Sequence, residues 1–357
     1  MTELTSQQRF DRAFRHSATP DRVPMFDMYW PDTFAEWHRQ GLPEGFDLFD
    51  EFGLDVLGIS WIDASLGLPA EQLEESDEWV IWRDGNGVVV KVWKTSSATP
   101  SRLDCYVKDW DTWLEVKDRL QPSPDRISQA IRDGWKSVTE RSGYQCYTFA
   151  EPCWWFLEDI MSFERALPLM VEQPDLVNDI IGTATDFGLA MAEVMITEGL
   201  PCDALWFFSD LCYKNGMLFS PKTYRELLMP HHKRIKEWCL AHDWQLILHC
   251  DGYVGELIPL LLEVGFDAIQ PLEARCGNDV RTFKRLYGTD IAFFGNISAD
   301  VMATGRRDEI EEEVKSKLEI AKEGGGYIYH SDHSIPRTVT LEDYRFTLDC
   351  VKRYGKY

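Results

Sequence analysis

A histidine and an aspartate stand two residues apart after a short apolar run, where they could share one chemical task. The run Leu246–Leu248 leads directly into His249-Cys250-Asp251-Gly252. Side chains at positions i and i+2 of a strand share a face, so we expect His249 and Asp251 to converge while Cys250 faces away. Such a pair can bind a metal ion or move a proton. A hydrogen-bonded pair within a loop is the alternative.

Further imidazoles and carboxylates follow other apolar runs. Glu273 ends the run Ala268–Leu272, and Tyr329-His330-Ser331-Asp332-His333 follows the glycines at 324–326. Histidines and carboxylates from several strand ends can form a zinc site rich in nitrogen and oxygen donors. The predicted metal ligands are His249, Asp251, Glu273 and His333. We interpret His330 as an ordinary loop residue, and Cys276 stays open as one further ligand.

Two more carboxylates are candidates for proton transfer. Glu151 is followed by Pro152-Cys153-Trp154-Trp155, and Asp210 closes the run Ala204–Phe208. A tryptophan wall would raise the pKa of Glu151 by desolvation and make it a proton donor. Asp210 is predicted to act in the same way, to orient a ligand or to pair with Lys214. The alternative for both tryptophans is packing in the core.

These residues follow a repeated pattern of short apolar runs separated by stretches long enough for a helix. Eight such units predict an α/β fold of the (β/α)8 TIM barrel type, in which the loops after the strands build the active site. The predicted strands are Val23–Tyr29, Leu54–Trp61, Tyr144–Ala150, Ala204–Phe208, Leu246–Leu248, Ala268–Leu272, Ile291–Phe294 and Tyr327–Tyr329. The strand ends predict a substrate-binding set of Asp27, Tyr29, Trp61, Trp154, Trp155 and Asn296.

One insertion interrupts the pattern between the second and third strands. Glu78–Trp82 and Val88–Lys94 flank the turn Arg83–Gly87, which predicts a β-hairpin at about residues 78–95. Ser6–His16 has helical spacing and precedes the first strand, as a lid under a barrel would. No linker or repeat is evident, so residues 1–357 are predicted to be a single domain.

Composition narrows the class of partner. The 357 residues include 37 Lys and Arg against 60 Asp and Glu, giving a net charge of −23, which argues against nucleic acid and anionic membranes as partners. We expect no spanning helix and no signal peptide. Nine cysteines without regular spacing fit reduced thiols and a cytoplasmic protein. Nucleotide-binding, serine hydrolase and zinc-protease motifs are absent.

Several segments together resemble the uroporphyrinogen decarboxylase-like superfamily, whose fold is a (β/α)8 barrel. The segments that carry the resemblance are Pro20–Pro24, Lys214-Asn215-Gly216, Ser220–Glu226, Leu248–Gly252, Gly295–Ser298, Gly325–Ile328 and His333–Pro336. The superfamily implies two chemistries. True decarboxylases use two arginines near the N-terminus, and Arg22–Trp30 here lacks those cations after the strand. Because an octa-acidic substrate needs cations, the decarboxylase becomes the alternative.

The other branch comprises zinc-using, corrinoid-dependent methyltransferases. The resemblance aligns His249, Asp251 and His333 with a His-x-Cys and a later Cys of that branch, so both cysteines are replaced here. Harder ligands favour an oxygen substrate over a thiol. This implies an O-demethylase component that moves a methyl group from a methoxylated, aromatic compound to the cobalt of a separate corrinoid protein. A module that only binds an aromatic ligand is the third alternative.

Overall fold

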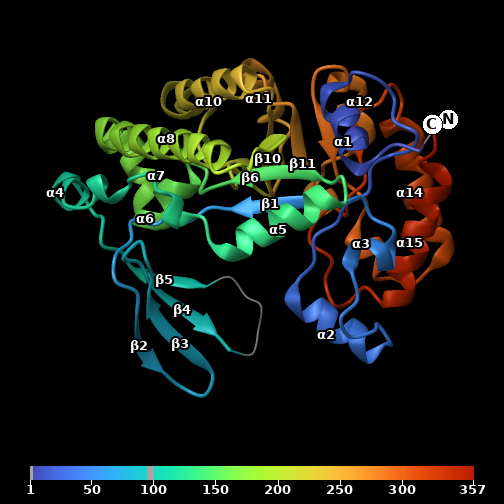
Figure 1. Cartoon of the computed structure of the whole chain (residues 1–357), viewed down its shortest axis with the longest axis horizontal. Helices are drawn as coiled ribbons and strands as arrows, with labels where there is room; N and C mark the ends of the chain where they lie inside the picture. The colour runs from blue at the N-terminus through green and yellow to red at the C-terminus, as the bar shows by residue number, and fades with distance from the viewer. Residues whose placement is uncertain (1–2, 95–99) are drawn as a thin grey trace.

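Seven parallel strands form the central sheet of the computed structural model, which describes residues 3–94 and 100–357 (Figure 1). In spatial order they are β1 (Leu57–Trp61), β6 (Tyr144–Thr148), β7 (Ala204–Phe208), β10 (Gln245–Cys250), β11 (Ala268–Pro271), β12 (Ala292–Phe294) and β13 (Tyr327–Ile328). All residues of β6 and β7 are buried, as expected of parallel strands covered on both faces. Seven of the eight predicted strands are therefore confirmed.

The remaining predicted strand, Val23–Tyr29, forms isolated bridges instead of a regular strand. Met25 pairs with Tyr329 in parallel, and the Tyr329 N–H donates to the Pro24 carbonyl at 2.9 Å. On the other side, the Asp55 N–H donates to the Met25 carbonyl at 2.8 Å. This segment therefore lies between β13 and the chain that leads into β1, and it links the two edges of the curled sheet as a barrel requires. Pro24 has no N–H to extend the ladder.

Helix α1 (Ser6–Arg15) packs against the inner face of this sheet. Thr5 caps its N-terminus through a capping box with Gln8. Phe10 and Phe14 contact Tyr144 and Phe294 from the sheet, and all four rings are buried. The predicted helical lid is confirmed.

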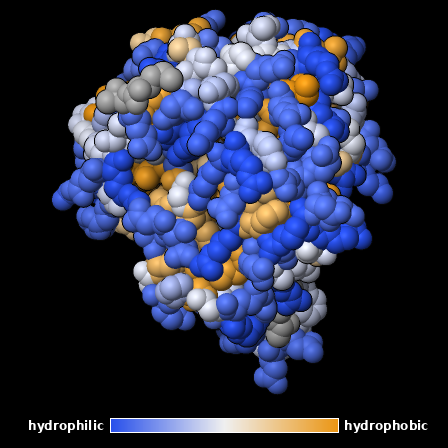
Figure 2. Space-filling view, turned by 90° about the vertical axis from the view of Figure 1, so that its right-hand side faces the viewer, coloured by the Kyte–Doolittle hydropathy of each residue, from blue (hydrophilic) through white to orange (hydrophobic). Residues whose placement is uncertain are grey.

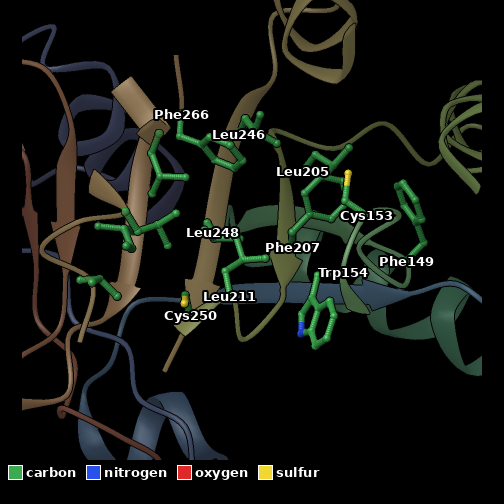
Figure 3. Packing of buried hydrophobic residues seen from close by; sticks show 14 of the residues in the cluster. Phe149, Cys153, Trp154, Leu205, Phe207, Leu211, Leu246, Leu248, Cys250 and Phe266 are labelled. Carbon is green, nitrogen blue, oxygen red and sulfur yellow. The ribbon is translucent and has the colours of Figure 1, made fainter. Parts of the chain in front are cut away.

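A second core lies between the sheet and the outer helices. Leu205 and Phe207 of β7 and Leu246 and Leu248 of β10 face this layer (Figure 3). The alternate residue Ile247 belongs to the inner cluster, so successive side chains of β10 point to opposite faces. This alternation sends His249 inward and Cys250 outward, as predicted.

The outer layer consists of helices that connect the strands. They are α2 (Pro31–Arg39), α3 (Leu48–Phe52), α4 (Trp110–Leu114), α5 (Gln129–Glu140), α6 (Trp155–Met161), α7 (Phe163–Glu172), α8 (Pro174–Thr197), α9 (Pro221–Thr223), α10 (Met229–Ala241), α11 (Ile258–Val264), α12 (Val280–Tyr287), α13 (Ala299–Met302), α14 (Arg307–Ala321) and α15 (Leu341–Tyr354). By length and composition α8 could cross a membrane, but 56% of its most apolar window is buried. It packs against α7 and α10 (Figure 1), as a core helix does.

The insertion is larger than predicted. The hairpin is confirmed as β3 (Trp79–Arg83) and β4 (Val89–Trp93), but β2 (Glu71–Glu75) and β5 (Ser101–Asp104) flank it in a four-stranded antiparallel sheet. Every residue of β2 is exposed, so its sequence carries no apolar alternation that could have revealed it. Position 95, the predicted end of the hairpin, lies outside the described residues.

This antiparallel sheet projects away from the parallel strands (Figure 1). Arg102 of β5 ties it to α6, because its guanidinium donates to Glu158 at 2.8 Å and to Asp159 at 2.5 Å. The face of the molecule that includes α14 and α15 is mostly hydrophilic, with small apolar patches between charged side chains (Figure 2). This surface agrees with the high content of charged residues.

Candidate metal and substrate site

The carboxyl ends of β7 and β10 bring the first group of donor side chains together. His249 Nε2 lies 3.8 Å from Asp210 Oδ1 and 3.8 Å from Asp251 Oδ2. The backbone N–H of Asp251 donates to Asp210 Oδ1 at 3.0 Å and fixes the two loops together. The inward register of β10 thus places an imidazole between two carboxylates.

A second group shares Asp251 with the first. Glu273 follows β11, His333 lies in the loop after β13, and His333 Nε2 is 3.3 Å from Asp251 Oδ2. The donors of Asp210, His249 and Asp251 lie within 4.8 Å of one another, and so do those of Asp251, Glu273 and His333. All four predicted ligands therefore meet at one rim of the sheet, with both imidazoles facing the same carboxylate.

The hydrogen bonding of these carboxylates is uneven. Asp251 Oδ1 is buried and has no hydrogen-bond partner among the residues that the structure describes. Glu273, in contrast, accepts from the Gly252 N–H at 2.6 Å, from Arg275 at 2.7 and 2.9 Å and from the Cys276 thiol at 3.3 Å. A buried oxygen that accepts no hydrogen bond is costly unless a cation or a ligand satisfies it. Of these carboxylates, Asp251 therefore has the most unused lone pairs for binding a cation.

The surroundings shift the pKa values of the two aspartates in opposite directions. Burial raises the pKa of Asp210, and repulsion from Asp251 adds to the effect, although His249 opposes it. Burial also acts to raise the pKa of Asp251, but the hydrogen bond from His333 and the electrostatic attraction of the neighbouring imidazoles outweigh it and lower that pKa. Neighbouring carboxyls with divergent pKa values are typical of acid–base sites, which favours Asp210 as the proton carrier.

Aromatic rings flank the donors on one side. The Trp61 side chain is 50% exposed, and its ring lies 4.7 Å from Phe208, whose ring lies 5.0 Å from His249. Trp155 is partly buried and donates through Nε1 to Asp159 at 3.1 Å. Trp61 and Trp155 thus remain candidates for binding a flat ligand, and Phe208 is a member of this wall that the sequence did not reveal.

A hollow of about 280 Å³ lies on the side of His333. Trp30 stacks on His333 with a ring distance of 5.7 Å and lines the hollow together with Arg275, Asp300 and Asp332. Neither Trp30 nor Arg275 was predicted as a site residue, although Trp30 directly follows the predicted strand Val23–Tyr29.

The prediction that Glu151 is a proton donor with a raised pKa is wrong. It is fully buried, and its oxygens accept hydrogen bonds of 2.8 to 3.0 Å from three backbone N–H groups and two side chains: those of Cys153, Trp154, Trp155, Ser209 and His232. Burial alone would raise the pKa of Glu151, but the hydrogen bond and charge of His232 and the N–H donors bring it to about 2. Glu151 is therefore an ionised residue that holds the start of α6.

Three predicted substrate contacts also face away from the donor groups. Trp154 is fully buried in the outer core against Phe163 and Phe219 (Figure 3). Tyr29 packs against helix α2 and hydrogen-bonds the Tyr344 hydroxyl at 2.5 Å. Asp27 is 1% exposed and accepts from the Tyr329 and Tyr344 hydroxyls at 3.0 and 3.1 Å. Side chains alternate between the two faces of an extended chain. Because Phe26 and Met28 point inward, Asp27 and Tyr29 point away from the inner face.

Asn296 is likewise a structural residue. Its amide donates to the carbonyls of Leu272 and Asn278 at 2.7 and 3.0 Å and accepts from the Val280 N–H at 3.0 Å. The side chain is fully buried. Because its amide is hydrogen-bonded to three loop backbone groups, Asn296 joins the chain segments after β11 and β12 and faces away from the donor cluster.

A curled parallel sheet with its polar cluster at the carboxyl ends of the strands defines an α/β protein of the barrel type. The sequence model described as uroporphyrinogen decarboxylase (URO-D) matches residues 115–354. The chain belongs to this family.

Two known proteins illustrate the relationship. A uroporphyrinogen decarboxylase from Pelobacter propionicus is 25% identical over 199 residues, which are 56% of this chain and 54% of that protein. The alignment thus spans about half the length of that relative. A structure described as a methyltransferase from Methanosarcina mazei superposes over 99% of both chains with a TM-score of 0.69 and 17% identity. At this identity the likeness supports a shared fold.

Proposed function

We propose that this protein moves a methyl group from a methoxylated, aromatic compound to the corrinoid of a separate protein, with assistance from zinc. The observation that carries the proposal is the convergence of His249, Asp251, Glu273 and His333 at the open rim of the sheet, beside the exposed ring of Trp61. The structural similarity to a methyltransferase is consistent with this choice within the family.

The donor set fits a divalent cation. No described residue hydrogen-bonds the buried Asp251 Oδ1, and His249 Nε2 faces two carboxylates at 3.8 Å, a separation that a cation would bridge. His249, Asp251 and His333 would hold zinc, and Glu273 would join them by releasing Arg275. Bound zinc would act as a Lewis acid on the ether oxygen, which makes the phenolate a better leaving group.

The other side chains have separate tasks. Trp61 and Trp155 would flank the aromatic ring, since flat faces of indole bind such rings well. Asp210, with its raised pKa, would supply a proton to the departing oxygen. The methyl carbon must remain open to the partner that accepts it, and Trp61, at 50% exposure, leaves this side of the site accessible.

A decarboxylase acting on a tetrapyrrole or a smaller acid is the alternative, favoured by the family and by the Pelobacter relative. The arginines near the rim do not suit a substrate with many carboxylates. Arg275 pairs with Glu273, and Arg102 pairs with Glu158 and Asp159. Asp27, a carboxylate that could protonate an intermediate of such a reaction, is 1% exposed and buried behind the sheet.

The test combines metal content with turnover. Purified wild-type protein should contain one equivalent of zinc or more and demethylate methoxyarenes only when a corrinoid protein is present. His249→Ala should lose the zinc and at least 100-fold of the activity. His231→Ala is the matched control, because His231 lies on α10 and contacts Asn178. Zinc-free wild-type protein that decarboxylates a porphyrinogen would refute the proposal.

A further inference from the structure

We propose that Gln270 and His330 are positioning residues that hold His249 in one tautomer, with the proton on Nδ1 and the lone pair of Nε2 directed at Asp210 and Asp251. The inference follows from hydrogen-bond directions, together with the burial of His330. It deepens the proposed function, on which it rests only for the use made of that lone pair.

The chain of hydrogen bonds that fixes the tautomer begins at His330, which is fully buried. Its Nδ1 lies 2.6 Å from the Ser331 carbonyl and 3.6 Å from Asp27 Oδ1. Both neighbours are acceptors, so Nδ1 must carry a proton. Burial lowers the pKa of His330 and keeps the ring neutral. Its Nε2 is therefore a lone pair that needs a donor.

Gln270 supplies that donor, and the orientation of its amide then determines which nitrogen of His249 is protonated. It is 1% exposed, and its amide nitrogen donates to His330 Nε2 at 3.2 Å. The amide oxygen consequently faces the other way and lies 2.6 Å from His249 Nδ1. Because a carbonyl oxygen can only accept, His249 Nδ1 must be the protonated nitrogen.

The outer nitrogen of His249 then has no proton while the ring is neutral. Its distances of 3.8 Å to Asp210 and Asp251 are longer than a hydrogen bond, as expected when a lone pair faces two carboxylates. The opposite tautomer would require Gln270 to turn its amide. Its oxygen would then face the lone pair of His330, leaving two buried acceptors opposed.

The buried residues Asp27, His330 and Gln270, which lie behind the site, together orient the His249 ring. Asp27 accepts from the Ser331 N–H at 2.9 Å and so helps to fix the carbonyl that orients His330. The chain from Asp27 to His249 selects an imidazole that accepts, which is the state needed to bind a cation or to take a proton.

Nuclear magnetic resonance of metal-free protein labelled with ¹⁵N-histidine tests the proposal. The chain has only eight histidines, and His249→Gln identifies the signals of that ring by their loss. We expect wild-type His249 to show a protonated Nδ1 and an unprotonated Nε2. A protonated Nε2 in the neutral wild-type ring would overturn the inference.

Two substitutions separate positioning from simple packing. Gln270→Leu should give a mixture of both tautomers and weaken zinc binding about 10- to 100-fold. Gln270→Glu keeps an acceptor beside His249 but brings a carboxylate against His330. It should therefore preserve the His249 tautomer while His330 gains a second proton. An unchanged His249 tautomer in Gln270→Leu would overturn the role of Gln270.

A second position and a control keep the result interpretable. His330→Phe removes the ring nitrogens and should also mix the tautomers of His249, even if Gln270→Leu does not fold. Gln72→Leu, on exposed β2, should change neither the spectrum nor zinc affinity. Zinc binding with the opposite tautomer would refute this inference alone. The expected tautomer without zinc binding would refute the proposed function alone.

Discussion

Within residues 3–94 and 100–357, two clusters of histidine and acidic side chains have spacings that suit a metal ion, yet they differ in hydrogen bonding. Glu151, Cys153 and His232 form one, which is entirely buried between the sheet and the outer helices. The other is centred on Asp251 at the open rim. We call them the buried cluster and the rim cluster.

The difference lies in unused lone pairs. In the buried cluster, five donors satisfy Glu151, and the Tyr224 hydroxyl lies 2.9 Å from the other nitrogen of His232. In the rim cluster, Asp251 Oδ1 has no hydrogen-bond partner in the described part of the chain, and His249 Nε2 lies 3.8 Å from both Asp210 and Asp251. Donor spacing alone therefore does not identify a site. The capacity left after internal hydrogen bonding does.

The largest expected effect concerns the buried cluster. Glu151→Gln removes the charge that pairs with His232 and turns one of the two acceptor oxygens into a donor that faces N–H groups, so it should lower the free energy of unfolding by about 3–5 kcal/mol. Chemical denaturation measures this. Glu140→Gln, an exposed side chain 3.7 Å from Lys136, should change the value by less than about 0.5 kcal/mol. Equal stability of the two variants would break the comparison.

Acid should remove most of the Glu151 contribution. Its folded pKa of about 2 lies below the ordinary value of about 4.3. The stabilisation is therefore fully present above about pH 4.3 and is lost as the pH falls through about 2. The gap in unfolding free energy between wild type and Glu151→Gln should shrink over this range. A gap that stays constant down to pH 2 would contradict the low pKa.

The rim cluster should respond in the opposite way. Asp251→Asn should weaken zinc binding at least 100-fold, about 2.7 kcal/mol, because it removes the shared donor of both groups. The free energy of unfolding of the metal-free protein should stay within about 1 kcal/mol, since Oδ1 finds no hydrogen-bond partner among the described residues and the amide keeps one oxygen for His333. Calorimetric titration with zinc gives the first value and denaturation the second. A large loss of metal-free stability would show that Asp251 is structural.

Two tryptophans, Trp61 at the rim and Trp154 in the outer core, extend the comparison to ligand binding. The substitution of Trp61 should have the smallest effect of those considered. Trp61→Ala should weaken binding of a methoxyarene about 10-fold, or about 1.4 kcal/mol, with little change in stability because half of the ring is exposed. Trp154→Ala should instead destabilise the fold by about 3–5 kcal/mol. Ligand affinity measured by fluorescence should separate them. A Trp61→Ala variant that binds normally would remove Trp61 from the site.

The strand pattern and the rim donors could be predicted from local sequence. Apolar runs ending in polar residues located seven strands, and the spacing of His249 and Asp251 placed both on one face. Strand β2 could not be predicted, because all five of its residues are exposed and mostly acidic. Glu151 and Asn296 were also misjudged, since their positions after strands are the same as those of Asp210 and Glu273.

The sequence by itself determined which residues stand at the strand ends, because alternation along an extended chain fixes the face of each side chain. Only the tertiary structure decided which of them remain available for chemistry. Glu151 is saturated by His232 from α10 and Ser209 from the loop after β7, whereas Asp251 meets His333 and keeps a bare oxygen. Those partners lie far apart in the chain. Whether a carboxylate keeps an unused lone pair therefore depends on which side chains the folded structure packs against it.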